Sequence, residues 1–137
     1  MVDAARKQFV TIARVANRIY EVHDIRILEC DPSGPPLAGE RDVNPLMESA
    51  WAEKAKLIAI PAARLAPSFF QLKSGVAGAI IQKLVVYHFR VAIVGDIAEH
   101  IARSPTFADF VRETNRGREV WFVASLDELN QRVCGSI

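Results

Sequence analysis

The chain has 137 residues, the size of one domain, and a domain of this length buries roughly two-thirds of its unfolded surface without disulfides or a structural metal. Hydrophobic residues make up 50% and charged residues 24%, which is the composition of an ordinary soluble globular protein and not of a disordered one. The formal net charge of +1 argues against a general electrostatic binder of nucleic acid or of an anionic membrane.

The cysteines and histidines give no sign of a metal site. Cys30 and Cys134 show no CxxC or Cys/His spacing, and the histidines show no HxH, HxxxH or HExxH spacing. No apolar run approaches the roughly 20 residues that span a bilayer, and the first residues lack a secretory h-region. We therefore expect a cytoplasmic protein with reduced thiols, no metal, no cofactor and no membrane contact.

The first part of the chain predicts a short lead-in followed by a β-hairpin. Residues 1–17 show no clean period and are expected to be irregular or briefly helical. The runs 18–22 and 25–30 are apolar and rich in β-branched residues, and His23 and Asp24 separate them, which is typical of a hairpin. Residues 31–40 hold three prolines and two glycines, so they must form a loop.

A first helix and a first buried strand follow. The helix is predicted from residue 42 to about residue 54, with Asp42 as its cap and Pro45 in its first turn. Its apolar stripe consists of Leu46, Met47, Ala50 and Trp51. Residues 57–61 are a short apolar run ended by proline, which predicts a strand covered on both faces. Phe69 and Phe70, in the next loop, are expected to pack that loop onto the sheet.

The second half alternates helices and strands. Ser74 is predicted to cap a central helix that runs to about Tyr87, and a buried strand over 89–94 then ends on Gly95 and Asp96. Ser104 and Pro105 start a helix that ends at 115–117. The last strand is expected at 120–124 with Trp121 in the core, and a capping box at 125–128 opens a terminal helix through residue 133.

These elements predict an α/β fold in one domain, residues 18–137. The order is β-β-α-β-α-β-α-β-α, with about five strands and four helices. Strands joined by helical crossovers should lie parallel, and the N-terminal hairpin should extend the sheet as a mixed edge.

The run FFQLKSGVAGAIIQKLVVYHFRVAIVGD, residues 69–96, and the run SPTFADFVRETNRGREVWFV, residues 104–123, carry a family resemblance. Together they resemble the bacterial domain-of-unknown-function family 4180, whose members have a similar Phe-Phe-Asp-Leu-x-Thr-Gly helix start, a Gly-Asp strand end and an Asn-Arg-Gly turn. The resemblance covers about residues 24–133 and implies no activity. The chain departs from the family pattern at Gln71, Ser74, Ala79 and Val86, where relatives carry Asp, Thr, Glu and Asn. If those polar groups bind a ligand in relatives, this chain lacks part of the site.

The element order also resembles the STAS domain, the fold of anti-sigma-factor antagonists. In that fold a Ser or Thr followed by Gly, at the start of the helix after the third strand, is a phosphorylation switch. Ser74 and Gly75 stand at the matching place. The resemblance therefore implies a switch at Ser74.

The central helix is the first candidate site. A helix N-terminus favours anions, so Ser74 with Lys73 beside it could hold a phosphate, or Ser74 could simply cap the helix. Gly75 and Gly78 make the first turns thin, and Ser74, Gly78 and Gln82 share one face at four-residue spacing. This face is either a partner or dimer surface or the side that packs tightly on the sheet.

The carboxyl ends of the strands and one helix end are the other candidate sites. In open α/β sheets ligands bind at this edge, which is expected to gather Arg64, Lys73, Ser74, Asp96 and Ser104. Asp96 could bind a metal or a hydroxyl, or could be a turn residue. Asn115 and Arg116 could bind a phosphate or carboxylate, or could only end a helix. No carboxylate has a partner acid, histidine or nucleophile at motif spacing, so no catalytic residue is assigned.

Three functions remain open from the sequence. The first is a non-enzymatic STAS-like module that binds a protein partner and is switched at Ser74. The second is a small-molecule or nucleotide binder, or an enzyme, that uses the strand-end residues. The third is a structural homodimer built on the central helix.

Overall fold

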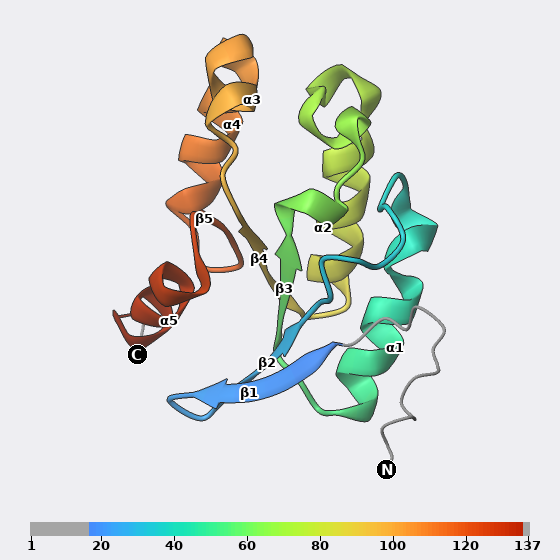
Figure 1. Ribbon diagram of the computed structural model, residues 1–137, viewed down its shortest axis with the longest axis vertical. Coiled ribbons are helices and arrows are strands. Elements are labelled where there is room, and N and C mark those ends of the chain that lie inside the picture. The colour runs from blue at the N-terminus through green and yellow to red at the C-terminus, as the bar shows by residue number, and fades with distance from the viewer. Residues whose placement is uncertain (1–16, 136–137) are drawn as a thin grey trace.

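The computed structural model describes residues 17–135, so the predicted lead-in lies outside the described residues except for Asn17. It contains one five-stranded sheet in the order β1-β2-β3-β4-β5. The strands are β1 (Arg18–Val22), β2 (Ile25–Glu29), β3 (Leu57–Pro61), β4 (Arg90–Val94) and β5 (Val120–Val123). β1 pairs antiparallel with β2, and the other neighbours pair in parallel (Figure 1). The predicted single-domain mixed α/β sheet is confirmed.

Within residues 17–135 five α-helices accompany the sheet, one more than predicted. They are α1 (Asn44–Ala52), α2 (Val76–Val86), α3 (Ala98–Arg103), α4 (Pro105–Asn115) and α5 (Leu126–Gly135). Short 3-10 turns precede α1 and α2, at η2 (Glu40–Val43), η4 (Pro67–Phe70) and η5 (Leu72–Ser74). The extra helix is α3, which occupies the segment between β4 and the predicted start at Pro105.

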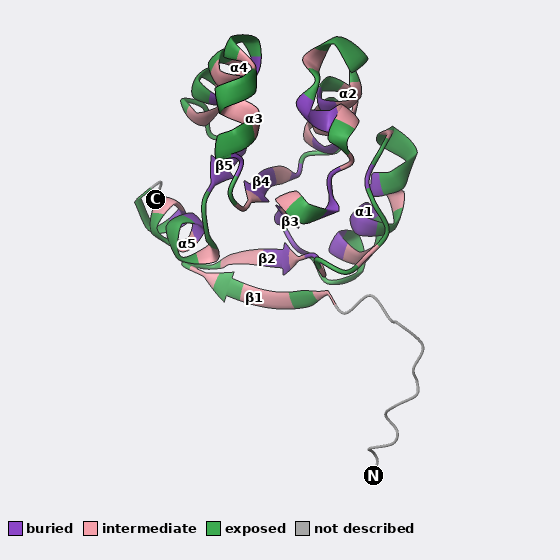
Figure 2. Ribbon diagram, turned by 45° about the horizontal axis from the view of Figure 1, so that its top comes forward, coloured by how far each residue is buried: buried purple, intermediate pink, exposed green. Residues whose placement is uncertain are grey.

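The two faces of the sheet carry separate cores. The larger core joins α1, α2 and α4 to one face, and its fully buried members include Leu28, Ile58, Ile60, Ile80, Leu84 and Phe107. The smaller core joins α5 to the other face through Leu129 and Val133, which pack with Ala92 and Trp121. Figure 2 shows that β1 contains no buried residue, whereas every residue of β5 is buried. The buried residues of the sheet therefore lie on the parallel strands β2 to β5, and β1 is the exposed edge strand.

A series of packed aromatic rings connects the turns before α2 to β5, the last strand of the sheet. Phe69 and Phe107 are fully buried, and Phe70 packs edge to face on both of them. Phe107 in turn packs on Phe122 of β5. Such aromatic pairs add about 0.5–1.5 kcal/mol each beyond the area they bury. The expected packing of Phe69 and Phe70 onto the sheet is confirmed.

Two predicted helix caps are wrong in detail. The Asp42 carboxylate accepts the N–H groups of Ala38 and Gly39, so it closes the turn before α1 and does not cap the helix. α2 begins at Val76 with Gly75 as its N-cap, in a left-handed conformation at φ 78° that favours glycine. Ser74 lies one residue earlier, in η5.

Two other predicted starts are confirmed. The Ser104 hydroxyl accepts the Phe107 N–H at 3.1 Å and caps α4. At the start of α5 the Ser125 hydroxyl accepts the Glu128 N–H, and the Glu128 carboxylate accepts the Ala124 N–H. The capping box thus forms with its return bond one residue earlier than the usual pattern.

The two tryptophans differ in burial. Trp121 is 3% exposed, as predicted for a core residue, whereas Trp51 is 51% exposed and its predicted place in the α1 core stripe is wrong. Leu46, Met47 and Ala50 fill that stripe, and Trp51 lies at the last turn of α1, beside the end of α2.

Candidate functional site

The structure does not bring the five predicted strand-end residues together. Arg64 is only 4% exposed, and its guanidinium donates to the carbonyl oxygens of Pro35 at 2.8 Å and Asp31 at 3.0 Å. A Cβ atom on Gly34 would lie 2.4 Å from Cζ of Arg64, so the loop passes directly over the guanidinium. Arg64 therefore fastens the proline-rich loop to the segment that follows β3, with two of its five N–H donors bonded to that loop.

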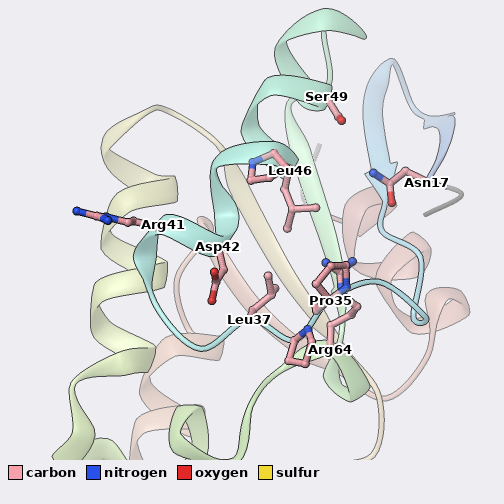
Figure 3. A pocket seen from close by; sticks show the side chains of 10 residues that line it. Asn17, Pro35, Leu37, Arg41, Asp42, Leu46, Ser49 and Arg64 are labelled. Carbon is pink, nitrogen blue, oxygen red and sulfur yellow. Dashed lines mark hydrogen bonds between the residues drawn. The ribbon is translucent and has the colours of Figure 1, made fainter. Parts of the chain in front are cut away.

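Arg64 also borders a cavity of about 470 Å³ between the proline-rich loop and α1 (Figure 3). The Asp42 carboxylate on its rim already accepts two backbone N–H groups. In Figure 3 the Arg41 side chain points away from Arg64. Arg64 and Asp42 thus maintain the loop beside this cavity, and we do not assign a ligand to it.

The side chains of Asp96 and Ser104 both accept hydrogen bonds from nearby backbone N–H groups. The Asp96 Oδ1 atom accepts the Ala98 N–H at 2.9 Å, which starts α3. Ser104 is the N-cap of α4, and its hydroxyl accepts from Phe107. The structure thus gives Asp96 the turn role that the sequence left open, and Ser104 the N-cap role that the sequence predicts.

Asn115 and Arg116 both interact with residues of their own chain near β5, the outer strand of the sheet. The Asn115 amide accepts the Phe122 N–H at 2.6 Å and donates to the Phe122 carbonyl at 3.3 Å, so it takes the place of a neighbouring strand along the free edge of β5. Arg116 is exposed and pairs with Glu113 at 3.1 Å. Asn115 thus protects a strand edge, and Arg116 forms a surface ion pair within its own segment.

A second cavity, which we call the edge cavity, lies at the carboxyl ends of β3 and β4. Its volume is about 520 Å³. One wall comes from η4 and η5, with Pro67, Phe70, Gln71, Leu72 and Lys73. The other wall comes from α3 and the start of α4, with His100, Arg103, Ser104 and Thr106. Of the predicted strand-end residues only Lys73 and Ser104 line it.

The His100 ring joins the two walls. It stacks on the Phe70 ring with centroids 3.7 Å apart and planes 5° apart. These residues lie thirty positions apart in the chain, on different walls, so no local pattern predicts the contact. The sequence did carry one signal for the second wall, since Asp96 followed three residues later by Glu99 is a helix-start pattern.

Ser74 is exposed at the start of α2. Its hydroxyl donates to the Ser68 carbonyl at 2.6 Å and accepts the Val76 N–H at 3.2 Å. The hydroxyl therefore links η4 to the first turn of α2. Neighbouring Lys73 is exposed and forms no ion pair with any residue that the structure describes.

The outer side of α2 and the adjoining end of α1 form an exposed surface, which we call the α2 face. It consists of Gly78, Gln82, Val86, Tyr87 and Trp51. A Cβ atom on Gly78 would meet nothing within 4 Å, so this glycine faces open space, whereas Ala77 packs inward at 1% exposure. The alternative that all the small residues pack on the sheet is therefore wrong for Gly78.

The α2 face contains the exposed large hydrophobic side chains of the described residues. Trp51 is 51%, Tyr87 49% and Val86 60% exposed. The Trp51 and Tyr87 rings lie edge to face with centroids 5.7 Å apart, and Trp51 also contacts Phe89. Neighbouring Ala79, Gln82 and Lys83, with Glu40 from η2, border a shallow hollow. Sequence reasoning missed Trp51 and Val86 here because periodicity gives the direction of a side chain and not what lies over it.

The Cys30 thiol is buried, and the side chains that could bind a metal ion are dispersed over the described residues. Burial raises the pKa of the Cys30 thiol to about 12, only partly offset by the nearby Arg64 guanidinium, so it is an inert core thiol. Within residues 17–135 no group of three or more His, Cys, Asp or Glu side chains could hold a metal ion. In the same range no helix is long and apolar enough to cross a bilayer.

The family described as Domain of unknown function (DUF4180) matches residues 22–133 of the chain. This range contains the parallel strands β2 to β5, the α2 face and the edge cavity. No curated protein and no solved structure matches the chain significantly.

Proposed function

Since the chain belongs to the family described as Domain of unknown function (DUF4180), which names no activity, we propose a function from its surface: a non-enzymatic, STAS-like protein-binding module. Its contact surface is the α2 face, and its place is the bacterial cytoplasm. The observation that carries this proposal is a thin, exposed helix beside three exposed large apolar side chains.

The stability cost of a glycine at position 78 supports a role for this position in binding a partner. Glycine inside a helix costs about 1 kcal/mol relative to alanine, and nothing within 4 Å requires the missing Cβ at this position. A glycine followed by Ala79 would instead allow the backbone of a partner to approach α2 closely. The cost to the free chain is then offset in the complex.

The side chains around Gly78 are suited to an interface. Tryptophan and tyrosine are the residues most often found at the energetic centre of interfaces, and an apolar cluster at a surface is a common mark of one. Gln82 and Lys83 add polar groups at the margin. The residues Val76–Val86 include no acidic side chain. Glu40 of η2 lines the same hollow as Lys83, so an acidic and a basic side chain both lie at this margin. We therefore expect the partner to present a helix with an apolar stripe flanked by both acidic and basic side chains.

Phosphorylation of Ser74 is the proposed switch. A phosphate would remove the hydroxyl donation to Ser68 and place about two negative charges at the start of α2 beside Lys73. The helix dipole favours that charge, and η4 would lose its link to α2. The exposure of Ser74 to solvent supports this role, because a kinase needs access to the hydroxyl.

The test is a comparison of co-purifying proteins. The tagged chain and the variants Val86→Glu and Gln131→Glu are purified from the cells of origin, and retained proteins are quantified by mass spectrometry. Both variants add a carboxylate at an exposed helical position, but Gln131 lies on α5, away from the α2 face. We expect one partner in near-stoichiometric amount, lost with Val86→Glu and kept with Gln131→Glu. A second, differently tagged copy that behaves this way would identify the chain as its own partner.

The proposal is contradicted if Val86→Glu, folded as judged by circular dichroism, keeps the same proteins as the unaltered chain. Loss of a partner with both variants would also count against the α2 face, because the effect would then not be local.

A further inference from the structure

The edge cavity carries charge of one sign. Lys73 stands on the wall formed by η5 and Arg103 on the wall formed by α3, and none of the described lining residues is acidic. Arg103 approaches Glu99 only at 3.9 Å, with both side chains largely exposed, and such pairs contribute little. The two cations are therefore available to an anion that lies between the walls.

Uncharged hydrogen-bond donors of Ser104 and Thr106 could also bind an anion in this cavity. The Ser104 and Thr106 side chains line the cavity where α4 begins. In that first turn Pro105 has no N–H, and the Phe107 N–H is bonded to Ser104. The N–H of Thr106, the second helical residue, has no intrahelical partner by geometry, and α4 is eleven residues long, so the end of its dipole also favours negative charge.

The wall formed by η4 and η5 is largely apolar, and its aromatic ring is held in place by other rings. Pro67, Phe70 and Leu72 supply its apolar groups. Phe70 is 8% exposed, and its ring is held by edge-to-face contacts with Phe69 and Phe107 and by the stacked His100 ring. A wall fixed in this way loses little entropy when a ligand binds.

We propose that the edge cavity binds a small organic anion: a carboxylate or a phosphate monoester on an aromatic or other flat apolar body. Lys73 and Arg103 hold the anionic group from opposite walls, and Ser104 and Thr106 donate hydrogen bonds to it. The apolar body lies against Phe70 and Leu72. A volume of about 520 Å³ falls in the range of small-molecule sites, about 300–1,000 Å³. This site is separate from the α2 face, and neither proposal depends on the other.

The experiment is an NMR titration of the ¹⁵N-labelled full chain. The probes are phenyl phosphate and benzoate, with inorganic phosphate and benzyl alcohol as fragments that lack the ring or the charge. We expect saturable shifts of the amides of Lys73, Arg103 and Thr106 with phenyl phosphate or benzoate, at a Kd on the order of 1 mM or tighter. The stronger of the two probes then tells whether the anion is a phosphate or a carboxylate.

Variants locate the binding. Lys73→Gln and Arg103→Gln should each raise Kd roughly tenfold, because each removes one charge-assisted hydrogen bond. Arg112→Gln is the matched control, since Arg112 is also an exposed arginine paired with an acid on its own helix but does not line the cavity.

Three results would overturn the proposal. The first is the absence of saturable shifts with both aromatic anions. The second is an equal loss of binding in Arg112→Gln. The third is binding of inorganic phosphate or benzyl alcohol as tight as that of the aromatic anions, which would mean that the cavity does not recognise charge and ring together.

Discussion

Single polar residues in this chain mostly hold the backbone in place. Arg64 has the charge and position expected of a ligand-binding residue at a strand end, yet it is buried and two of its five N–H donors bond to the carbonyls of Pro35 and Asp31. Asn115 similarly pairs with both backbone groups of Phe122. A buried polar group left unpaired costs about 1–3 kcal/mol, so such residues take the nearest backbone partners. Sequence alone could not separate this role from ligand binding, because both need the same residue types.

Cys30 gives a prediction for alkaline pH. Its folded pKa is about 12, against an ordinary value of 9.0, because burial disfavours the thiolate. Between these values the unfolded chain has lost a proton that the folded chain keeps, so the free energy of unfolding falls as pH rises. The contribution is fully present below pH 9 and decreases by about 1.4 kcal/mol per pH unit above it.

Urea unfolding at pH 8 and pH 10 measures this loss. The unaltered chain should lose more stability than Cys30→Ala over this interval, while Cys134→Ala, at an exposed cysteine, should follow the unaltered chain. Tyr20, whose pKa burial also raises, is present in every variant and cancels from the comparison. Equal losses in Cys30→Ala and the unaltered chain would show that Cys30 is not desolvated in the fold.

At the scale of the elements, the two glycines at the start of α2 should respond to alanine substitution with opposite changes in stability. Gly75 has φ 78°, so Gly75→Ala should lower the free energy of unfolding by about 1 kcal/mol or more. Gly78 is helical and faces open space, so Gly78→Ala should raise it by about 0.5–1 kcal/mol. Urea unfolding of both variants provides the measurement. If Gly78→Ala destabilises the chain, something already packs against that position and the α2 face is not open.

Elements with strong local signals were predictable. Serine followed by proline marks the start of α4, and continuous apolar runs mark β3 and β5. α3 is not predicted because it is only six residues long and because an aspartate after a strand, such as Asp96, is equally typical of a turn. The cap of α2 was misplaced by one residue because Ser74 and Gly75 are both acceptable caps, and the conformation of the η5 turn decides between them.

At the scale of the whole molecule, the order of the strands decides where a site can form. The strands lie in chain order, so the sheet has no point where the connections reverse direction, and that point is where open α/β sheets usually bind ligands. The mixed sheet followed from the alternation of helices and strands. The sequence did not predict which residues line the edge cavity, because that depends on how the turns after β3 pack against α3. The stacking of His100 on Phe70 is such a contact, and it forms the edge cavity.

The exposure of the α2 face is likewise a property of the whole fold. The sequence placed Gly78 and Gln82 on one side of a helix, but only the assembled chain leaves that side uncovered and adds Trp51 from α1. The proposed binding function depends on that exposure, so it needs a measurement at the surface itself.

Site-specific photo-crosslinking in the cells of origin tests this central claim most directly. A benzophenone amino acid replaces Gln82 on the α2 face or, as a control, Gln131 on α5, both at exposed helical positions. We expect one discrete adduct from position 82, absent from position 131 and abolished when Val86→Glu is added. Equal adducts from both positions, or none from position 82 at the same level of folded protein, would contradict the account.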